Sequence, residues 1–257
     1  MIAVSGLKLR PGDGEAKLKT LAAKALRVPE RNISDWRILK KSLDARKKSD
    51  IHYIYTVAVT AAGDEAALIA RGKNARLWAP FAYDVPRVTP AKRPVVVGFG
   101  PGGMFAALVL AYAGARPIVL ERGPEAAARQ RAVEAFRAGG PLDPEANVQF
   151  GEGGAGTFSD GKLHTGTHDQ RIQWVLEQFV RHGAPGHICY DAKPHVGTDV
   201  LLRVVRAIRE TVIADGGEVR FGAKVTGLSV KDGQITGVTV NGEQTLETDR
   251  VILAIGH

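Results

Sequence analysis

The stretch PVVVGFGPGGMFAALVLAYAGARPIVLERG, residues 94–123, decides the fold of most of this chain. A valine-rich run is followed by a glycine-rich turn, an alanine- and leucine-rich segment and a second apolar run. Strand, helix and strand over about 30 residues make the β-α-β unit that joins parallel strands. The segments GFGPGG and GAR interrupt the apolar residues. The apolar stretch is therefore divided into shorter elements, which argues against a membrane-spanning helix. It predicts an α/β fold with a parallel sheet.

The glycine turn has the spacing GxGxxG, which is typical of a dinucleotide-binding loop. The spacing allows a tight turn, room for a pyrophosphate and close packing of helix on sheet, while the helix N-terminus favours the anion. Glu121 ends the second strand, where a carboxylate can accept the hydroxyl groups of an adenosine ribose. The loop residues predicted to bind the cofactor are Gly98, Gly100, Pro101, Gly102 and Gly103.

A small α+β domain is predicted before this unit, at residues 1–88. Strands and helices are expected in the order β-α-β-β-α, which favours a ferredoxin-like arrangement. The net charge of +8 comes from the first 90 residues, since acidic and basic residues balance in the rest. A proline-rich linker is predicted at 89–94 and a Rossmann-like domain at 95–257.

The rest of the second domain is predicted as helices followed by a β-meander. Residues 124–140 read as a helix with many exposed charges, and two amphipathic helices follow after a glycine-rich stretch. Three consecutive strands are expected at 218–230, 234–240 and 243–249, with an Asn-Gly turn as a hairpin signal. An apolar strand, RVILAIGH, ends the sequence.

Three motifs together resemble a family of bacterial FAD-dependent dehydrogenase-like proteins within the glutathione-reductase-like flavoprotein superfamily. They are GPGGMFAALVLAYAGARPIVLERG, FGEGGAGTFSDGKL and KPHVGTDVLLRVVRAIRE, and the segment RILKKSLDARKK near the N-terminus matches as well. The resemblance implies FAD bound non-covalently, with a meander that crosses over between strands of the FAD-binding sheet. It also implies an oxidoreductase that transfers hydride, with NAD(P)H as a candidate electron donor.

The resemblance extends the set of expected FAD contacts. The second glycine stretch is expected to lie along the phosphates and the ring, and the first meander strand is expected to meet the adenine. The added residues are Arg122, Gly153, Gly154, Thr157, Ser159, Lys162, Val225 and Gly256. Related proteins continue beyond the strand equivalent to VILAIGH, so the FAD-binding domain is expected to be incomplete at its C-terminus. No catalytic acid or base is assigned.

Two other functions remain open from the sequence. The basic segment at 37–50 could make residues 1–88 an RNA- or partner-binding module, with phosphates contacted by Lys40, Lys41, Arg46, Lys47 and Lys48. An NAD(P)-dependent dehydrogenase is the other alternative, because the glycine motif alone does not choose between dinucleotides. The single cysteine, Cys189, excludes disulfide and CxxC chemistry within the chain and fits a cytoplasmic location. The histidines lack ligand spacing, so no metal is expected.

Overall fold

The computed structural model describes residues 1–158, 161–163 and 165–256. It is a mixed α/β fold that divides into two compact units, each described by itself. Unit 1 comprises Met1–Tyr83, Lys162–Val180 and Pro185–His195. Unit 2 comprises Asp84–Gly161, Arg181–Ala184 and the chain from Val196 onward. The predicted boundaries at 88 and 94 stay a prediction.

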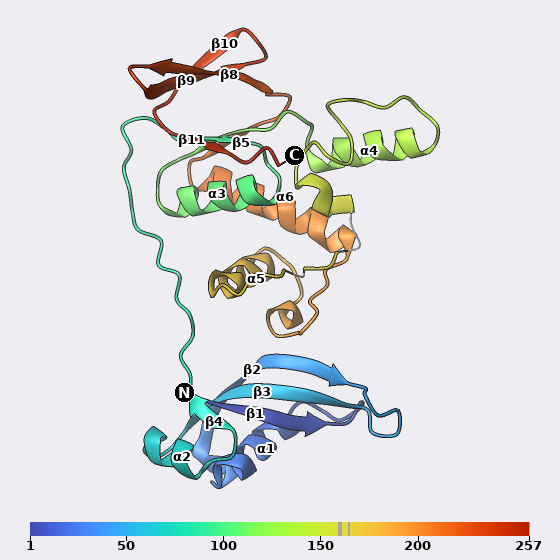
Figure 1. The fold of residues 1–257 in the computed structure, drawn as a ribbon, viewed down its shortest axis with the longest axis vertical. Helices are drawn as coiled ribbons and strands as arrows, with labels where there is room; N and C mark the ends of the chain where they lie inside the picture. The colour runs from blue at the N-terminus through green and yellow to red at the C-terminus, as the bar shows by residue number, and fades with distance from the viewer. Residues whose placement is uncertain (159–160, 164, 257) are drawn as a thin grey trace. The chain divides into compact units, whose positions relative to one another are not determined.

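Unit 1 contains a four-stranded sheet with the strand order β2-β3-β1-β4, in which all neighbours are antiparallel. Its strands are β1 (Ile2–Leu9), β2 (Ile33–Asp44), β3 (His52–Ala61) and β4 (Ala75–Leu77). Helices α1 (Lys17–Leu26) and α2 (Glu65–Arg71) lie on one face of this sheet (Figure 1). A short 3-10 helix, η1 (Glu30–Asn32), leads into β2.

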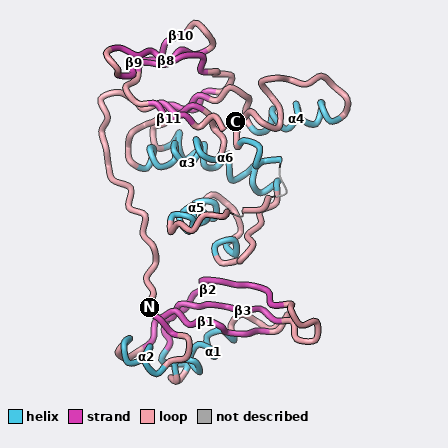
Figure 2. Tube along the Cα trace, viewed as in Figure 1, coloured by secondary structure: helices cyan, strands magenta, loops and turns pink. Residues whose placement is uncertain are grey.

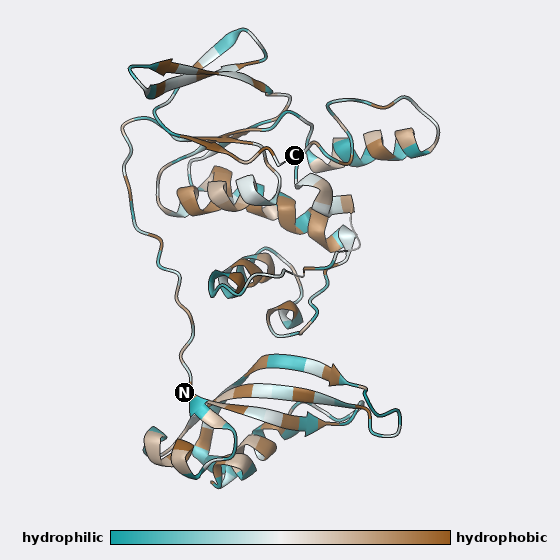
Figure 3. Ribbon diagram, viewed as in Figure 1, coloured by the Kyte–Doolittle hydropathy of each residue, from teal (hydrophilic) through white to brown (hydrophobic). Residues whose placement is uncertain are grey.

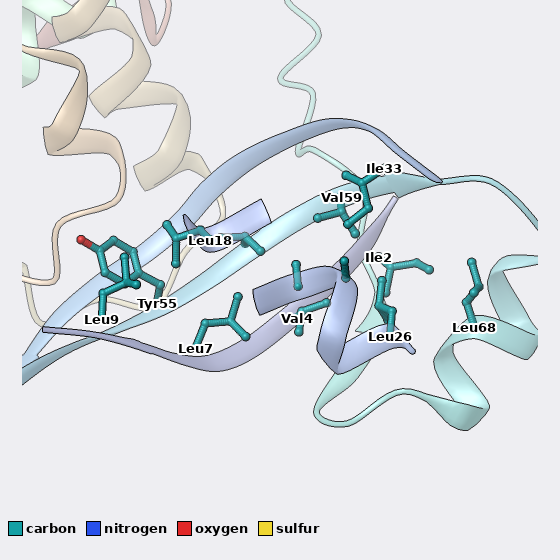
Figure 4. Close-up of a cluster of buried hydrophobic side chains, with 13 residues drawn as sticks. Ile2, Val4, Leu7, Leu9, Leu18, Leu26, Ile33, Tyr55, Val59 and Leu68 are labelled. Atoms are coloured by element: carbon teal, nitrogen blue, oxygen red, sulfur yellow. The ribbon is translucent and has the colours of Figure 1, made fainter. Parts of the chain in front are cut away.

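The core of unit 1 lies between this sheet face and the two helices. Apolar and polar residues alternate along the strands, as Figure 3 shows by colour, so one face of each strand is apolar. Ile2, Val4 and Val57 from the strands pack with Leu18 and Leu26 of α1, and all five side chains are fully buried (Figure 4). The apolar face of the strands, which repeats every 2 residues, therefore packs on the apolar face of the helices, which repeats every 3.6 residues.

A distant segment pairs with the outer edge of β2. The N–H of Lys41 donates to the carbonyl of Tyr190 at 2.7 Å, and the N–H of Ala192 donates to the carbonyl of Lys41 at 2.8 Å. Helix α5 (Arg171–Arg181) and the 3-10 helix η3 (Gly186–Cys189) precede this pairing. Unit 1 is therefore built from stretches that are far apart in the sequence.

Unit 2 contains a four-stranded sheet in the order β11-β5-β6-β7, and all its neighbouring strands are parallel. This confirms the predicted parallel β-α-β unit. Its strands are β5 (Val95–Val97), β6 (Ile118–Leu120), β7 (Glu218–Arg220) and β11 (Val251–Leu253). An antiparallel meander is formed by β8 (Val225–Lys231), β9 (Gln234–Val240) and β10 (Gln244–Glu247).

The parallel sheet is covered on both faces. Helices α3 (Pro101–Tyr112) and α6 (Thr198–Ala214) lie on one side and the meander on the other (Figures 1 and 2). Val95 and Val97 pack with meander residues such as Val238, whereas Val96 alternates to the opposite face. Burial on two faces explains why the central strands β5 and β6 are unbroken apolar runs, VVV and IVL. Helix α4 (Ala126–Arg137) and the 3-10 helix η2 (Gly154–Phe158) complete the unit.

One predicted strand is wrong. Residues 218–230 were expected to form the first strand of the meander, but they form two separate strands. β7 pairs with β6 in the parallel sheet, and only β8 joins the meander. Gly222, which has a positive φ of 62°, lies in the break between them. A glycine of this conformation lets the chain leave one sheet for the other.

Substitution of Gly103 tests the close contact of α3 with the turn after β5. A Cβ added there would lie 1.9 Å from the carbonyl oxygen of Gly98, whereas one at Gly102 would meet only the Ala254 Cβ, at 3.9 Å. We expect Gly103→Ala to destabilise the protein by about 2 kcal/mol or more, because the helix must move away from the loop. Gly102→Ala, the matched control, should change stability by less than about 0.5 kcal/mol. Urea unfolding followed by circular dichroism checks both; equal stabilities would contradict this packing.

Candidate functional site: a glycine-lined cleft

The turn between β5 and α3 forms one wall of the candidate site. Gly98 has a φ of 96°, and a Cβ there would lie 2.5 Å from the carbonyl oxygen of Ala254 at the end of β11. A Cβ at Gly100 would meet nothing closer than the Cα of Gly154, at 3.8 Å. Gly98 and Gly103 are therefore required by the protein's own packing. Gly100 is not, so its missing side chain leaves room for something outside the chain.

Helix α3 begins at this turn with backbone N–H groups that have no acceptor within the helix. Its N-cap is Gly100, which has no side chain to cap the helix, and Pro101 at the first position has no N–H. The N–H of Met104 donates to the carbonyl of Gly100 at 2.9 Å. The N–H groups of Gly102 and Gly103 precede the first intrahelical bond and have no acceptor within the helix. Together with the helix dipole they favour an anion at this end.

Glu121 follows β6 and holds three loops in place. Its side chain is only 4 % exposed. The carboxylate accepts hydrogen bonds from the N–H groups of Phe99 at 2.7 Å, Gly123 at 2.8 Å and Gly151 at 3.0 Å. Two carboxylate oxygens offer about four acceptor positions, so one remains for a group in the cleft. Glu121 thus has a structural role besides the ribose contact predicted for it.

The second glycine stretch packs directly on the first. The N–H of Gly153 donates to the carbonyl of Phe99 at 2.9 Å. Gly154 has a φ of 60°, and a Cβ there would lie 3.1 Å from the Cα of Gly100. Glycine is needed at Gly154 because a Cβ would crowd the backbone of Gly100, and at Gly153 because a Cβ would lie 2.4 Å from the Thr157 methyl group. The two glycine-rich stretches therefore form one continuous wall.

Arg129 of α4 fixes the conformation of this second stretch. Its side chain is fully buried, and it donates to the carbonyl oxygens of Asn147, Val148, Glu152 and Gly154 and to the Thr157 hydroxyl, at 2.7–3.0 Å. Burial lowers the pKa of Arg129 to about 10, so the guanidinium is still charged at neutral pH. Arg129 is not among the residues predicted from the sequence, because the charges of this helix were expected to be exposed.

Glu152, in the same stretch, is a buried carboxylate. Its Oε2 accepts from the N–H of Ala126 at 2.8 Å and lies 3.3 Å from the Arg209 guanidinium. Its Oε1 is buried without a hydrogen-bond partner among the described residues. Burial raises the pKa of Glu152 above its ordinary value. Its ionised form is therefore less favourable in the folded chain than in water.

These walls enclose a cleft of about 650 Å³ in unit 2. Its other sides are formed by the ends of β6 and β11, by Phe150 and by the start of the meander at Val225. Arg122 lies beside the cleft with its guanidinium 3.9 Å from the Phe150 ring centroid, and both Arg122 and Lys224 pair with Glu145. The lining thus combines free amides, two basic residues and apolar surface. Such a combination fits an elongated ligand that carries phosphates and a ring.

The structure brings most of the predicted site residues together. The lining includes Gly98, Gly100, Pro101, Gly102, Glu121, Arg122, Gly154, Val225 and Gly256. Gly103, Gly153 and Thr157 lie behind this lining, in packing contacts with Gly98, Val205 and Arg129. Lys162 belongs to unit 1, where it forms a single β-bridge with His195. The prediction for Ser159 lies outside the described residues.

Within residues 1–158, 161–163 and 165–256, no group of three or more His, Cys, Asp or Glu side chains could hold a metal ion. In the same residues, no helix is both long and apolar enough to cross a membrane.

Comparison with known sequences gives two matches. Residues 1–60 match a family described as a domain of unknown function, DUF8436. The whole chain is 41% identical, over 261 residues, to an uncharacterized protein of Clostridium beijerinckii (strain ATCC 51743 / NCIMB 8052). The match covers 100% of this chain and 49% of that relative. The chain therefore spans about half the length of the curated relative.

Solved structures with some similarity have low TM-scores. L-proline dehydrogenase from P. horikoshii is 14% identical with a TM-score of 0.43, covering 66% of this chain and 53% of that one. Glycine oxidase from Bacillus cereus ATCC 14579 is 11% identical with a TM-score of 0.39, covering 62% and 55%. The ferredoxin reductase for the CYP199A2 system from Rhodopseudomonas palustris is 17% identical with a TM-score of 0.30, covering 63% and 23%. Function is therefore inferred below from the cleft itself.

Substitution of Arg129 tests whether its guanidinium holds the second glycine stretch in shape. We expect Arg129→Lys to lower the free energy of unfolding by about 3 kcal/mol, because one ammonium cannot replace a fork of donors to five acceptors. Arg131→Lys, at an exposed position of the same helix, is the matched control and should be neutral. Thermal and urea unfolding measure the difference. Comparable stabilities of the two variants would show that the glycine stretch keeps its shape without the guanidinium.

Glu152 gives a pH-dependent prediction. At pH below the ordinary glutamate value of 4.5 the carboxyl is protonated in both folded and unfolded chains, so its burial costs little. As the pH rises through the raised folded-state pKa, the unfolded chain ionises first and the folded protein loses stability. Glu152→Gln keeps an acceptor for the Ala126 N–H and removes this loss. We expect the variant's stability advantage to grow with pH above 4.5 in urea unfolding, and an advantage that shrinks would mean that the Arg209 pair outweighs burial.

Proposed function

We propose that the chain binds FAD non-covalently in the cleft of unit 2 and is a FAD-dependent oxidoreductase or the N-terminal portion of one. The observation that carries this proposal is the convergence of three recognition elements on one cleft. They are the free N–H groups at the start of α3, the Glu121 carboxylate after β6 and the first meander strand at Val225. A dinucleotide needs all three, for its pyrophosphate, its ribose and its adenine.

The residues present fit this cofactor in chemical type. The N–H of Gly102, at the positive end of the α3 dipole, would hold the pyrophosphate, and Gly100 would let it approach the backbone. The remaining acceptor position of Glu121 would receive a ribose hydroxyl, and the backbone of Val225 would contact the adenine. When bound, FAD would supply the hydride-transfer chemistry, and the chain would position it and exclude water. Arg122 and Lys224 would balance the phosphate charge only in part, because Glu145 pairs with both.

The wider family assignment is also proposed. The motifs quoted from the sequence support membership in a bacterial FAD-dependent dehydrogenase-like family. The 49% coverage of the curated relative supports a longer protein in which further chain completes the active site. NAD(P)H is the proposed electron donor and the cytoplasm the proposed location. Residues 1–88 are proposed to be ferredoxin-like, which is supported by the β-α-β-β-α-β order and by the strand order β2-β3-β1-β4.

The RNA-binding alternative is weakened by internal ion pairs. Lys41 lies 3.1 Å from Glu15, and Arg46 lies 2.7 Å from Asp44, so two of the five proposed phosphate contacts already have carboxylate partners. A phosphate would have to displace these carboxylates. The basic segment is therefore a poorer polyanion site than its composition predicts.

Gly100→Val tests the proposed cofactor. A Cβ added at Gly100 would meet no atom of the chain closer than 3.8 Å, but the valine side chain would occupy the place of the pyrophosphate. We expect the purified protein to show a flavin spectrum and to release FAD on denaturation. The variant should bind FAD at least about 100-fold more weakly, since a buried ligand cannot share its space with a side chain.

Gly14→Val is the matched control, because a Cβ there meets nothing within 4 Å and Gly14 lies in unit 1. It should keep the FAD content of the unchanged protein. Binding of NAD(P)H but not of FAD by the unchanged protein would favour the dehydrogenase alternative. Equal FAD affinity of Gly100→Val would contradict the assignment of the cleft.

A further inference from the structure

A second cavity, of about 610 Å³, lies entirely within unit 1. Its floor is on the face of the sheet that points away from α1. Trp36, Ile38 and Ala75 pack against the helix-side core, so Arg37 of β2 and Arg76 of β4 alternate to the opposite face. The proposed FAD cleft shares no residue with this cavity.

The two arginines stand at the ends of one row across the sheet. Arg37 pairs with Ala58, Ala58 with Ala3, and Ala3 with Arg76. Residues paired in this way point to the same face. Ala3 and Ala58, at the centre of the row, are fully buried although neither belongs to the core under α1. Small residues there leave a hollow between two cations.

The Arg37 side chain crosses this hollow. Its guanidinium lies 5.7 Å from the centroid of the Trp78 ring, which follows β4 at the other edge of the sheet. From β2 the side chain extends in the direction of Ala58 and Ala3, along the row that ends at β4. A guanidinium stacked on an aromatic face keeps its in-plane N–H groups for an anion.

The two guanidinium groups share the cavity with one carboxylate, that of Glu177 on another wall, but form no described ion pair with it. Among the residues that the structure describes, neither Arg37 nor Arg76 forms an ion pair, whereas Lys41 of β2 and Arg46 in the turn after β2 do. Two such groups directed at one cavity favour a carboxylate or phosphate, which guanidinium binds through paired hydrogen bonds.

The other wall of the cavity is polar and partly aromatic. Gln170, Gln173 and Glu177 have the spacing i, i+3, i+7 and line it from the side of α5. The Gln173 amide donates to Glu177 at 3.0 Å, which holds that carboxylate in place. Phe81 adds an aromatic surface. The carboxylate opposes a second negative charge at this end, so a ligand with one anionic group fits best.

We propose that this cavity binds a small planar anion, an aromatic or heteroaromatic ring that carries one carboxylate or phosphate. The anionic group lies between Arg37 and Arg76, the ring lies against Trp78 and Phe81, and polar ring substituents meet the glutamine side chains. The site is separate from the proposed function and does not depend on it.

Calorimetric titration of the full chain tests the site with three probes. Indole-3-acetate and phenyl phosphate carry the two kinds of anion, and indole-3-acetamide is the neutral analogue. We expect one or both anions to bind, and the amide to bind at least about ten-fold more weakly, as a lost charged hydrogen bond predicts. Indole-3-acetate alone would identify a carboxylate ligand, and phenyl phosphate alone would identify a phosphate.

Substitutions locate the binding. Arg37→Gln and Arg76→Gln should each weaken anion binding by at least about ten-fold. Arg31→Gln, an exposed arginine outside the cavity, and Gly100→Val in the other cleft should leave it unchanged. Circular dichroism checks folding, and Arg76→Gln carries the test if Arg37→Gln unfolds.

Three results would overturn the proposal. The first is equal affinity for indole-3-acetate and indole-3-acetamide, and the second is anion binding that survives both arginine substitutions. The third is that neither anion binds at millimolar concentration. This result includes the case in which a single-stranded RNA oligonucleotide binds instead and the arginine variants lose that binding. That last case would assign the surface to nucleic acid.

Discussion

Arg129 donates to four backbone carbonyls and one hydroxyl within residues 147–157, and the rest of the candidate site depends on these contacts. A glycine-rich stretch loses more conformational entropy on ordering than other sequences do, so it does not take one shape by itself. The guanidinium donates hydrogen bonds to carbonyl groups that would otherwise be buried without donors. With these carbonyls fixed, Gly153 and Gly154 are presented to the first glycine turn.

Opposite charges satisfy the two kinds of backbone group in this region. The Glu121 and Glu152 carboxylates accept from N–H groups of Phe99, Gly123, Gly151 and Ala126, while Arg129 donates to carbonyls. Loop backbone that lies outside helices and sheets is thereby paired by buried acidic and basic side chains. This arrangement costs desolvation, which appears as the lowered pKa of Arg129 and the raised pKa of Glu152. It leaves the amides at the start of α3 free to face the cleft.

The sequence predicted the elements that local pattern determines. The apolar runs of β5 and β6, the glycine spacing between them and the hairpin turn at Asn241 each need only a few neighbouring residues to be recognised. Arg129 could not be found in this way, because its partners lie about 20 residues away and an arginine in an amphipathic helix usually faces solvent. Likewise, nothing near residues 218–230 shows that one part pairs with β6, since that pairing is set by distant chain.

The pairing of Lys41 with Tyr190 and Ala192 has a consequence for synthesis of the chain. The strands β1 to β4 and the helices α1 and α2 are complete once residue 77 has been made, but the partner of the β2 edge follows roughly 110 residues later. At ~5–20 residues per second the ribosome needs roughly 5 to 25 s for that interval. During it the edge of β2 is open to other strands. Charged side chains at an open strand edge oppose its pairing with other chains. The lysines and arginines along β2 and its turn would therefore keep a nascent sheet from pairing with other nascent chains on the same messenger RNA.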